Sequence, residues 1–305
     1  MVRQVLGEAA TPLTRLVELP GRGTTRVWEC AGPHGAETVM LIHGVTFTAE
    51  LNWGQVFAAL ARHFRVVAVD LRGHGDGIST GGRFRLEDCA DDIAALAEVL
   101  GLPRFVAVGY SMGGMVAQLL HRRHAPLLSG LVLCCTARNV RETPAENLAI
   151  LTLPAMLAAL RWNPALHLMS AEHLGKTLLG HVDDPVTDRW VRAQLSRTSL
   201  ASAVSAIQAV CEFRSDGWIG QVDVPAAVVV TTRDRIVPAS RQLRLAEAIP
   251  GASVHRVDAD HSVCINAPQL FAPALLEACW SVARSRGTRR PLVTRGLAAL
   301  PGRSR

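Results

Sequence analysis

The chain is 305 residues long, with 49% hydrophobic and 19% charged residues, a balance that excludes a disordered protein and fits a folded one with a sizeable core. Its net charge of +6 does not indicate nucleic-acid binding, because seven arginines and no acidic residue lie from residue 284 onward, which leaves −1 (6 minus 7) on the rest. No apolar run approaches the ~18 residues of a membrane span and no signal peptide is visible, so we expect a cytoplasmic protein.

Strand-like and helix-like patterns alternate along the N-terminal part of the chain. Residues 14–31 predict two strands, and the apolar run Thr38–Ile42 predicts a third. Residues 51–63 carry apolar side chains at helical spacing, and a further strand (64–70) and helix (86–100) follow. Strands that alternate with helices predict an α/β fold, with a mostly parallel sheet covered by helices on both faces.

The sequence Gly-Tyr-Ser-Met-Gly at 109–113 joins an apolar strand at 104–108 to an apolar helix. A serine at so sharp a turn is held in a strained backbone conformation, which raises its hydroxyl above the edge of the sheet. Gly109 and Gly113 leave room for this turn and for a substrate. The pattern alone arises by chance roughly 0.1 times in such a chain, so its place between strand and helix matters. We predict that Ser111 is the nucleophile of an acyl-transfer enzyme.

Two later strands are followed by the groups that such a serine needs. A β-branched run at 226–232 precedes Asp234, and a short strand at 253–257 precedes His261. A serine hydroxyl becomes a good nucleophile when a histidine takes its proton and a carboxylate holds the histidine ring. We therefore predict that His261 is the base and that Asp234 orients it.

Two other acids, Asp258 and Asp260, also lie beside His261 in the sequence. An acid one to three residues away is poorly placed to orient the imidazole ring. We therefore prefer Asp234 to either of them.

Negative charge on the carbonyl oxygen of a substrate requires two backbone N–H donors. One is expected from Met112, the residue after the serine. The second is expected from the loop after the strand Thr38–Ile42, where His43, Gly44 and Val45 follow, and we predict the N–H of Val45. His43 is interpreted as a brace for this loop rather than a second base, and His74 as part of the architecture of another loop.

In the middle of the chain the alternation stops and only helix signals remain. Asp184-Pro185 is typical of a helix start, and residues 199–213 place apolar side chains on one face. We predict that residues 138–222 form a helical cap, or lid, inserted into a core made of residues 1–137 and 223–286.

Two segments bear on substrates and surfaces. The apolar stretch at 148–162 either packs the cap onto the sheet or forms an apolar ceiling suited to acyl chains or aromatic rings. It is too short to span a bilayer, but an interfacial lid of this kind lies on a membrane surface. The basic segment 287–305 is expected to be disordered, and it is either solvated or in weak contact with an acidic membrane.

These motifs together resemble the α/β-hydrolase superfamily, and within it the serine hydrolases with a helical cap, such as esterases and lipases. The matching segments are His-Gly at 43–44, Asp-Leu-Arg-Gly-His-Gly at 70–75, Gly-Tyr-Ser-Met-Gly-Gly at 109–114, Arg-Asp-Arg-Ile-Val-Pro at 233–238 and Asp-His at 260–261. The resemblance implies an eight-stranded type of sheet and a reaction without metal or organic cofactor. Dehalogenases and epoxide hydrolases of this fold have an aspartate at the position of Ser111. Epoxide hydrolases also use cap tyrosines, whereas this chain has one tyrosine, Tyr110.

We therefore predict a hydrolase that cleaves an apolar acyl or aromatic carboxylic ester, a small molecule, through an acyl-enzyme on Ser111. Two enzymatic alternatives use the same residues. One transfers the acyl group to an alcohol or a peroxide, as acyltransferases and perhydrolases do. The other hydrolyses a carbon–carbon bond, although Ser262 stands where that class usually has tryptophan. A non-catalytic ligand receptor is a third alternative, disfavoured by the complete serine, histidine and aspartate set.

Overall fold

One eight-stranded sheet runs through the part of the chain that the computed structural model describes, residues 12–80, 82–141 and 184–288. Its strand order is β1-β2-β4-β3-β5-β6-β7-β8. The hairpin of β1 and β2 and the pairing of β2 with β4 are antiparallel, and all other neighbours are parallel. The predicted fold class, a mostly parallel eight-stranded sheet, is confirmed.

The strands have the following bounds: β1 Leu13–Leu19, β2 Gly23–Cys30, β3 Thr38–Ile42, β4 Arg65–Val69, β5 Phe105–Tyr110, β6 Leu128–Cys134, β7 Ala226–Thr231 and β8 Ser253–Val257. The helices are α2 Ala49–Trp53, α3 Phe57–Ala61, α4 Leu86–Val99, α5 Met112–His124, α8 Pro185–Leu195, α9 Leu200–Glu212, α10 Ala239–Ala248, α11 Val263–Asn266 and α12 Pro268–Thr288.

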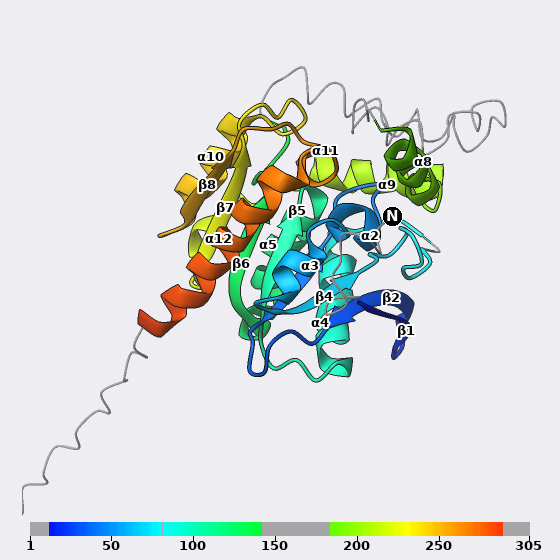
Figure 1. Cartoon of the computed structure of the whole chain (residues 1–305), viewed down its shortest axis with the longest axis horizontal. Coiled ribbons are helices and arrows are strands. Elements are labelled where there is room, and N and C mark those ends of the chain that lie inside the picture. The colour runs from blue at the N-terminus through cyan, green and yellow to red at the C-terminus, as the bar shows by residue number, and fades with distance from the viewer. Residues whose placement is uncertain (1–11, 81, 142–183, 289–305) are drawn as a thin grey trace, which may run out of the picture.

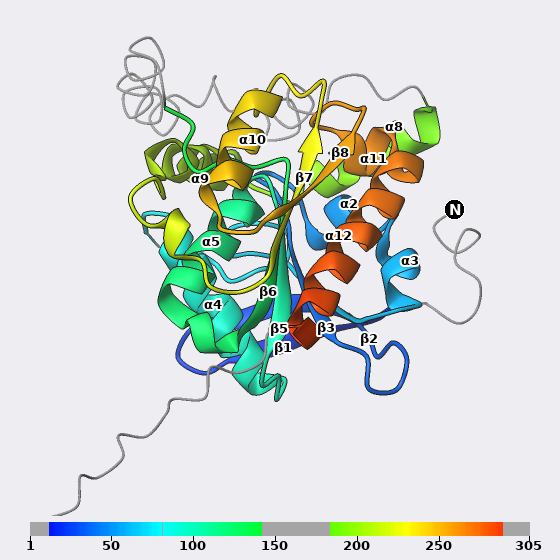
Figure 2. The same ribbon diagram turned by 90° about the vertical axis from the view of Figure 1, so that its left-hand side faces the viewer.

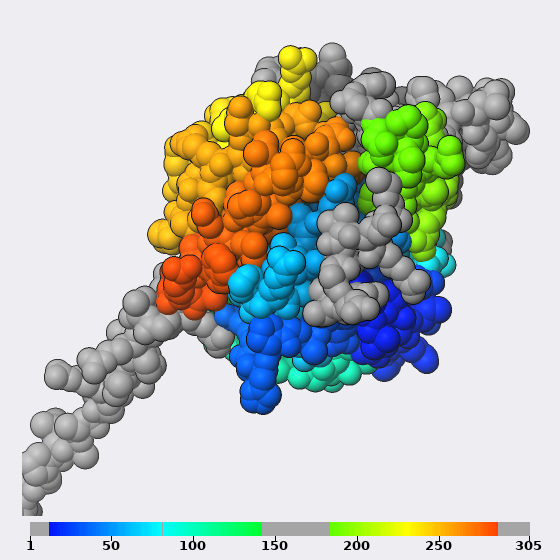
Figure 3. All heavy atoms as spheres, viewed as in Figure 1, coloured from blue at the N-terminus to red at the C-terminus, as the bar shows by residue number. Residues whose placement is uncertain are grey.

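Helices cover both faces of the sheet (Figures 1 and 2), and each face has its own apolar core. On β5, Phe105 and Ala107 point into the core under α4, α5 and α10, whereas Val106 and Val108 point into the core under α2, α3 and α12. Successive side chains of a strand face opposite sides, so a central parallel strand buried on both sides is a continuous apolar run. Figure 3 shows that α12 forms much of the second face.

The prediction of one helix over residues 51–63 was wrong. Two short helices, α2 and α3, stand in its place and are separated by residues 54–56. Thr48 begins α2, because its hydroxyl accepts a hydrogen bond from the N–H of Leu51 at 3.1 Å. Gly54 keeps helical dihedral angles, and the interruption follows it, where the N–H of Val56 donates to the carbonyl of Trp53, three residues back, at 2.9 Å.

Parts of the predicted cap fall within the described residues. Asp184 caps the first turn of α8 and Pro185 occupies its first position, while Ser199 caps α9. A hydrogen bond of 2.8 Å from Thr48 to Gln194 ties α8 to α2. The apolar stretch 148–162 and the basic segment 287–305 belong to predictions that lie wholly or largely outside the described residues.

No helix in the described ranges has the length and apolar character that crossing a bilayer requires.

Candidate active site

The parallel strands β3, β5, β7 and β8 all end at the same edge of the sheet. The loops that leave this edge carry the residues singled out from the sequence: the segment 43–45 after β3, Ser111 after β5, Asp234 after β7 and His261 after β8. Ligands of open parallel sheets bind at the carboxyl ends of the strands. This edge is therefore the candidate active site.

Ser111 occupies the turn between β5 and α5 in a conformation that few side chains adopt. Its φ is 52° and its ψ is −115°. Its backbone is held on both sides, because its N–H donates to the carbonyl of Cys134 at 2.9 Å and its carbonyl accepts from the hydroxyl of Thr136 at 2.8 Å. Residues in such regions cost about 1–3 kcal/mol each and persist where the surroundings enforce them. The side chain stays half-buried.

The two glycines around Ser111 are required by the packing of the turn. A Cβ at Gly109 would lie 2.2 Å from the carbonyl oxygen of Gly113, and one at Gly113 would lie 2.1 Å from the carbonyl oxygen of Ile42. Real Cβ atoms do not approach backbone this closely, so α5 packs against β3 and β5 only when glycine stands at both positions. Gly44 in the neighbouring loop faces the Cβ of Ser111, at 3.5 Å from where its own Cβ would stand.

The structure brings together the three side chains expected to act as a set. His261 Nε2 lies 3.1 Å from the hydroxyl oxygen of Ser111, and His261 Nδ1 lies 2.7 Å from Oδ2 of Asp234. The carboxylate is completely buried, and the imidazole is 9% exposed. One nitrogen of the ring therefore faces a hydroxyl and the other faces a carboxylate, which is the arrangement needed to pass a proton from the serine.

Asp234 is held by four further donors. Its Oδ1 accepts from the N–H groups of Ile236 at 2.9 Å and Val237 at 2.8 Å. Its Oδ2 also accepts from the hydroxyl of Thr231 at 2.8 Å and from the side-chain amide of Gln242 at 3.1 Å. These bonds fix the carboxylate and satisfy a buried charge. Sequence analysis missed Thr231 and Gln242, because nothing in the local pattern of β7 or α10 marks them.

The two neighbouring acids do not reach the imidazole of His261. Asp258 is 79% exposed and pairs with Arg233 at 3.1 Å. Asp260 turns to the next residue, where its Oδ1 accepts from the N–H of Ser262 at 2.9 Å and from its hydroxyl at 2.6 Å.

The two predicted oxyanion donors come from a helix and from a loop. The N–H of Met112 is at the first turn of α5, and the N–H of Val45 is in the loop after β3. Asn52 supports the loop after β3, because its Oδ1 accepts from the N–H of Gly44 at 2.8 Å. Sequence analysis missed Asn52, since it was read only as part of a helix.

His43 and His74 form bonds with the backbone. His43 Nε2 accepts from the N–H of Leu71 at 2.9 Å, so its Nδ1 carries the proton and donates to the carbonyl of Gly44 at 2.7 Å. Burial, together with the neighbouring His74, lowers the pKa of His43 to about 3. His74 is also buried, and burial lowers its pKa to about 4. Both rings are neutral at pH 7, and their contacts are those of loop braces.

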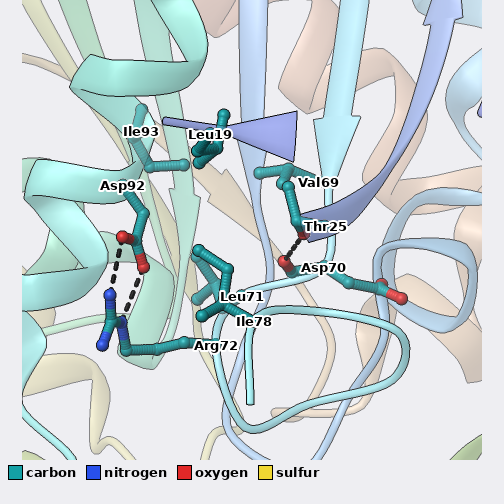
Figure 4. Close-up of a pocket in the computed structure, with 9 residues that line it drawn as sticks. All are labelled: Leu19, Thr25, Val69, Asp70, Leu71, Arg72, Ile78, Asp92 and Ile93. Carbon is teal, nitrogen blue, oxygen red and sulfur yellow. Dashed lines mark hydrogen bonds and ion pairs between the residues drawn. The ribbon is translucent and has the colours of Figure 1, made fainter. Parts of the chain in front are cut away.

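A second polar cluster lies on the α4 side of the sheet (Figure 4). Asp92 pairs there with Arg22 and with Arg72, each at 2.6 Å. The pocket beside this cluster has a volume of about 10 Å³ and is also lined by Leu19 and Ile93. A volume of this size holds about one water molecule. No serine or histidine lines it, and no group of three metal-binding side chains occurs in the described ranges.

The sequence is similar to that of a large family. A family model described as the α/β hydrolase fold matches residues 37–268. The pimeloyl-[acyl-carrier protein] methyl ester esterase of Chromobacterium violaceum is 30% identical over 251 residues, which cover 80% of this chain and 94% of the esterase. The 3-oxoadipate enol-lactonase 2 of Acinetobacter baylyi is 25% identical over 231 residues, covering 73% and 81%.

Solved structures share the same fold. A thermophilic esterase from Thermogutta terrifontis aligns with a TM-score of 0.72 at 22% identity, and the alignment covers 91% of this chain and 99% of the esterase.

Proposed function

Because this chain belongs to the α/β-hydrolase superfamily, we propose that it is a serine hydrolase that cleaves carboxylic esters through an acyl-enzyme on Ser111. The family resemblance seen in the sequence is confirmed, and the chain is accordingly a hydrolase of this fold. The observation that carries the finer proposal is one continuous line of contacts. It runs from the hydroxyl of Ser111 to His261 at 3.1 Å and from His261 to Asp234 at 2.7 Å.

In the acylation step, the oxygen of Ser111 attacks the carbonyl carbon of the ester while its proton passes to Nε2 of His261. Asp234, bonded to Nδ1 at 2.7 Å, keeps the proton on that nitrogen and stabilises the imidazolium that forms. The N–H groups of Met112 and Val45 hold the oxyanion, and each such donor typically contributes about 3–4 kcal/mol to the transition state. The alcohol then leaves with the proton from His261, and the acyl group remains on Ser111.

In the second step, a water molecule gives its proton to Nε2 of His261 and attacks the acyl carbon. The same two N–H groups hold the second oxyanion. When the intermediate collapses, the carbon–oxygen bond to Ser111 breaks and the serine recovers its proton from the histidine. The products are a carboxylic acid and the free enzyme.

The relatives support an ester as the bond that is cleaved. The name of one describes a methyl ester esterase, and that of another describes a lactonase, and a lactone is a cyclic ester. We propose an ester with an apolar acyl or aromatic group, as the apolar segment 148–162 led us to expect from the sequence.

The experiment is a series of p-nitrophenyl esters from acetate to palmitate, measured with the wild-type protein and with Ser111→Ala. We expect turnover by the wild type and background rates with the variant, because the variant lacks the attacking oxygen. A preference for medium or long chains would support an apolar acyl site. Rapid turnover of acetate with almost none of the longer esters would contradict it.

Added alcohol or hydrogen peroxide separates hydrolysis from acyl transfer. The proposal predicts that the carboxylic acid remains the main product at millimolar acceptor. If the acyl group goes mainly to the acceptor, transfer is the reaction. If the protein binds esters tightly but leaves them intact, it is a receptor and the proposed function fails.

A further inference from the structure

Tyr110 connects the nucleophile to the histidine loop. It is the last residue of β5 and the only tyrosine in the chain, and it directly precedes Ser111. Its phenolic hydroxyl donates a hydrogen bond of 2.5 Å to the backbone carbonyl of His261. Tyr110 is therefore joined by a peptide bond to Ser111 and by a hydrogen bond to the backbone of His261.

The ring of Tyr110 is fixed on several sides. It is fully buried, and it packs edge-to-face on Trp53 and on Phe271, with centroid distances of 6.0 and 5.7 Å. It also lies 5.8 Å from the ring of His261. A tyrosine ring held in this way has little freedom, so its hydroxyl is a fixed point to which the loop after β8 attaches.

The backbone carbonyls around His261 have different partners. The backbone N–H of Val263 donates to Asp260, and the N–H of Ile265 donates to Ser262. The carbonyl of His261 faces the phenol instead. The position of this carbonyl sets the direction in which the histidine side chain leaves the backbone, and so the distance between Nε2 and Ser111.

Resting on the proposed function, we infer that Tyr110 is a positioning residue of the reaction, whose hydroxyl holds the backbone of His261 so that the imidazole stays aligned with Ser111. The residue does not touch the reacting atoms. It acts through His261, and its contribution is to keep Nε2 in line with the serine oxygen during both proton transfers.

The surroundings keep the phenol in its donating form. Burial raises the pKa of Tyr110 well above its usual value. The hydroxyl is thus protonated throughout the pH range in which a histidine acts as base.

The first test is Tyr110→Phe, which removes one oxygen and keeps the ring. The rate must be expressed per active site, by titration with a fluorophosphonate, so that unfolded protein does not count. We expect kcat to fall roughly tenfold to a hundredfold with little change in KM, because misplacement of a catalytic group affects the transition state more than substrate binding. An unchanged kcat per titrated site would overturn the inference.

The matched control is Phe105→Leu, at the other end of β5, where the side chain is fully buried in the core on the opposite face of the sheet. It should lower the free energy of unfolding and leave kcat per active site within about twofold of the wild type. If this variant loses as much kcat as Tyr110→Phe, loss of stability rather than of the hydrogen bond explains the effect, and the inference fails.

A second measurement leaves Tyr110 and its hydroxyl in place. Because the chain has one tyrosine, growth with 3-fluorotyrosine places fluorine at one residue and gives one ¹⁹F resonance. Phenylboronic acid forms a tetrahedral adduct on a catalytic serine, which charges the histidine. We expect the resonance to shift on saturation with this acid, and to stay in place for Ser111→Ala. No shift in the protein with Ser111 would overturn the inference.

Different results would contradict the proposed function and the role of Tyr110. If Ser111→Ala hydrolyses esters as fast as the wild type, the proposed function is wrong. If only the wild type hydrolyses them and Tyr110→Phe is equally fast per active site, the proposed function stands and the role of Tyr110 falls.

Discussion

Two groups of loops leave the same edge of the sheet, and both contain histidine and aspartate. The loops after β5, β7 and β8 carry Ser111, Asp234 and His261, and the loops after β3 and β4 carry two histidines, His43 and His74, together with Asp70. In both groups the histidines and aspartates are buried. Burial and residue type therefore do not distinguish them.

The hydrogen-bond partners of these side chains distinguish the two groups of loops. Nδ1 of His261 meets a carboxylate and its Nε2 meets a hydroxyl, whereas the bonds of His43 go to the backbone. Asp70 accepts from the N–H groups of Ala49 at 2.8 Å and Asp76 at 2.9 Å. The first group can pass a proton between side chains. The second group ties loops together.

An imidazole becomes a candidate base through its two partners. A carboxylate on one nitrogen sets the tautomer, and a half-buried hydroxyl on the other supplies the proton. A ring whose partners are backbone groups has its pKa lowered by burial and stays neutral. Substitutions of matched residues in the two groups should separate these roles.

The largest difference is expected between the two histidine loops. His261→Ala should lower kcat by about a million-fold, because loss of the base in a serine triad removes almost all nucleophilic catalysis. His74→Asn, its counterpart, should keep kcat within a few-fold of the wild type, since His74 contacts none of Ser111, Asp234 and His261. Ester hydrolysis per folded molecule measures both. Equal losses in the two variants would remove the distinction between the loops.

The aspartates should differ by a smaller factor. Asp234→Asn should lower kcat by about ten-thousand-fold, as an amide favours the wrong tautomer of the histidine. Asp70→Asn should change kcat only a few-fold, because the partners of Asp70 are the backbone N–H groups of Ala49 and Asp76. A large loss in Asp70→Asn with a small one in Asp234→Asn would mean that the orienting acid is misassigned.

The smallest effect is a pH dependence of stability that arises in the second group. Folding lowers the pKa of His43 from 6.5 to about 3 and that of His74 from 6.5 to about 4, mainly through burial. Between about pH 6 and 4 the unfolded chain therefore binds two protons that the folded chain does not bind. Burial raises the pKa of Asp70 from 3.8 to about 6, so the folded chain binds one extra proton in the same range. The histidines lose stability as pH falls below 6.5, and Asp70 loses it as pH rises through 6.

The net difference is one proton, so these three groups should lower the free energy of unfolding by about 1.4 kcal/mol per pH unit as the pH falls from 6 to 4.5. His74→Asn removes one histidine and should flatten the slope by about that amount. Urea unfolding at several pH values measures it. An unchanged slope in His74→Asn would show that the ring is not held neutral in the folded protein.

Local sequence patterns predicted strands and the turn at Ser111, but fewer of the residues that support the candidate active site. The strands and the turn at Ser111 were predictable, because apolar runs and a glycine on each side of the serine leave a local pattern. The prediction of a single helix over 51–63 was wrong, since the backbone tightens to a turn between Trp53 and Val56 within that apolar run.

The residues that sequence analysis missed lie both near to and far from their partners along the chain. Gln242 is bonded to Asp234, eight residues before it, whereas the hydroxyl of Tyr110 reaches a carbonyl 151 residues away. The first contact depends on how α10 packs on β7 and the second on strands that lie side by side, so no local pattern reveals either. The lone tyrosine next to the serine was the one available signal.

In the proposed reaction the oxygen of Ser111 forms the covalent intermediate. This oxygen can be tested by labelling with a fluorophosphonate, followed by mass spectrometry of the intact protein and its peptides. We expect one adduct per molecule on the peptide that contains Ser111, and none on Ser111→Ala. Equal labelling of both proteins, or an adduct on a different residue of the wild type, would contradict the proposed reaction.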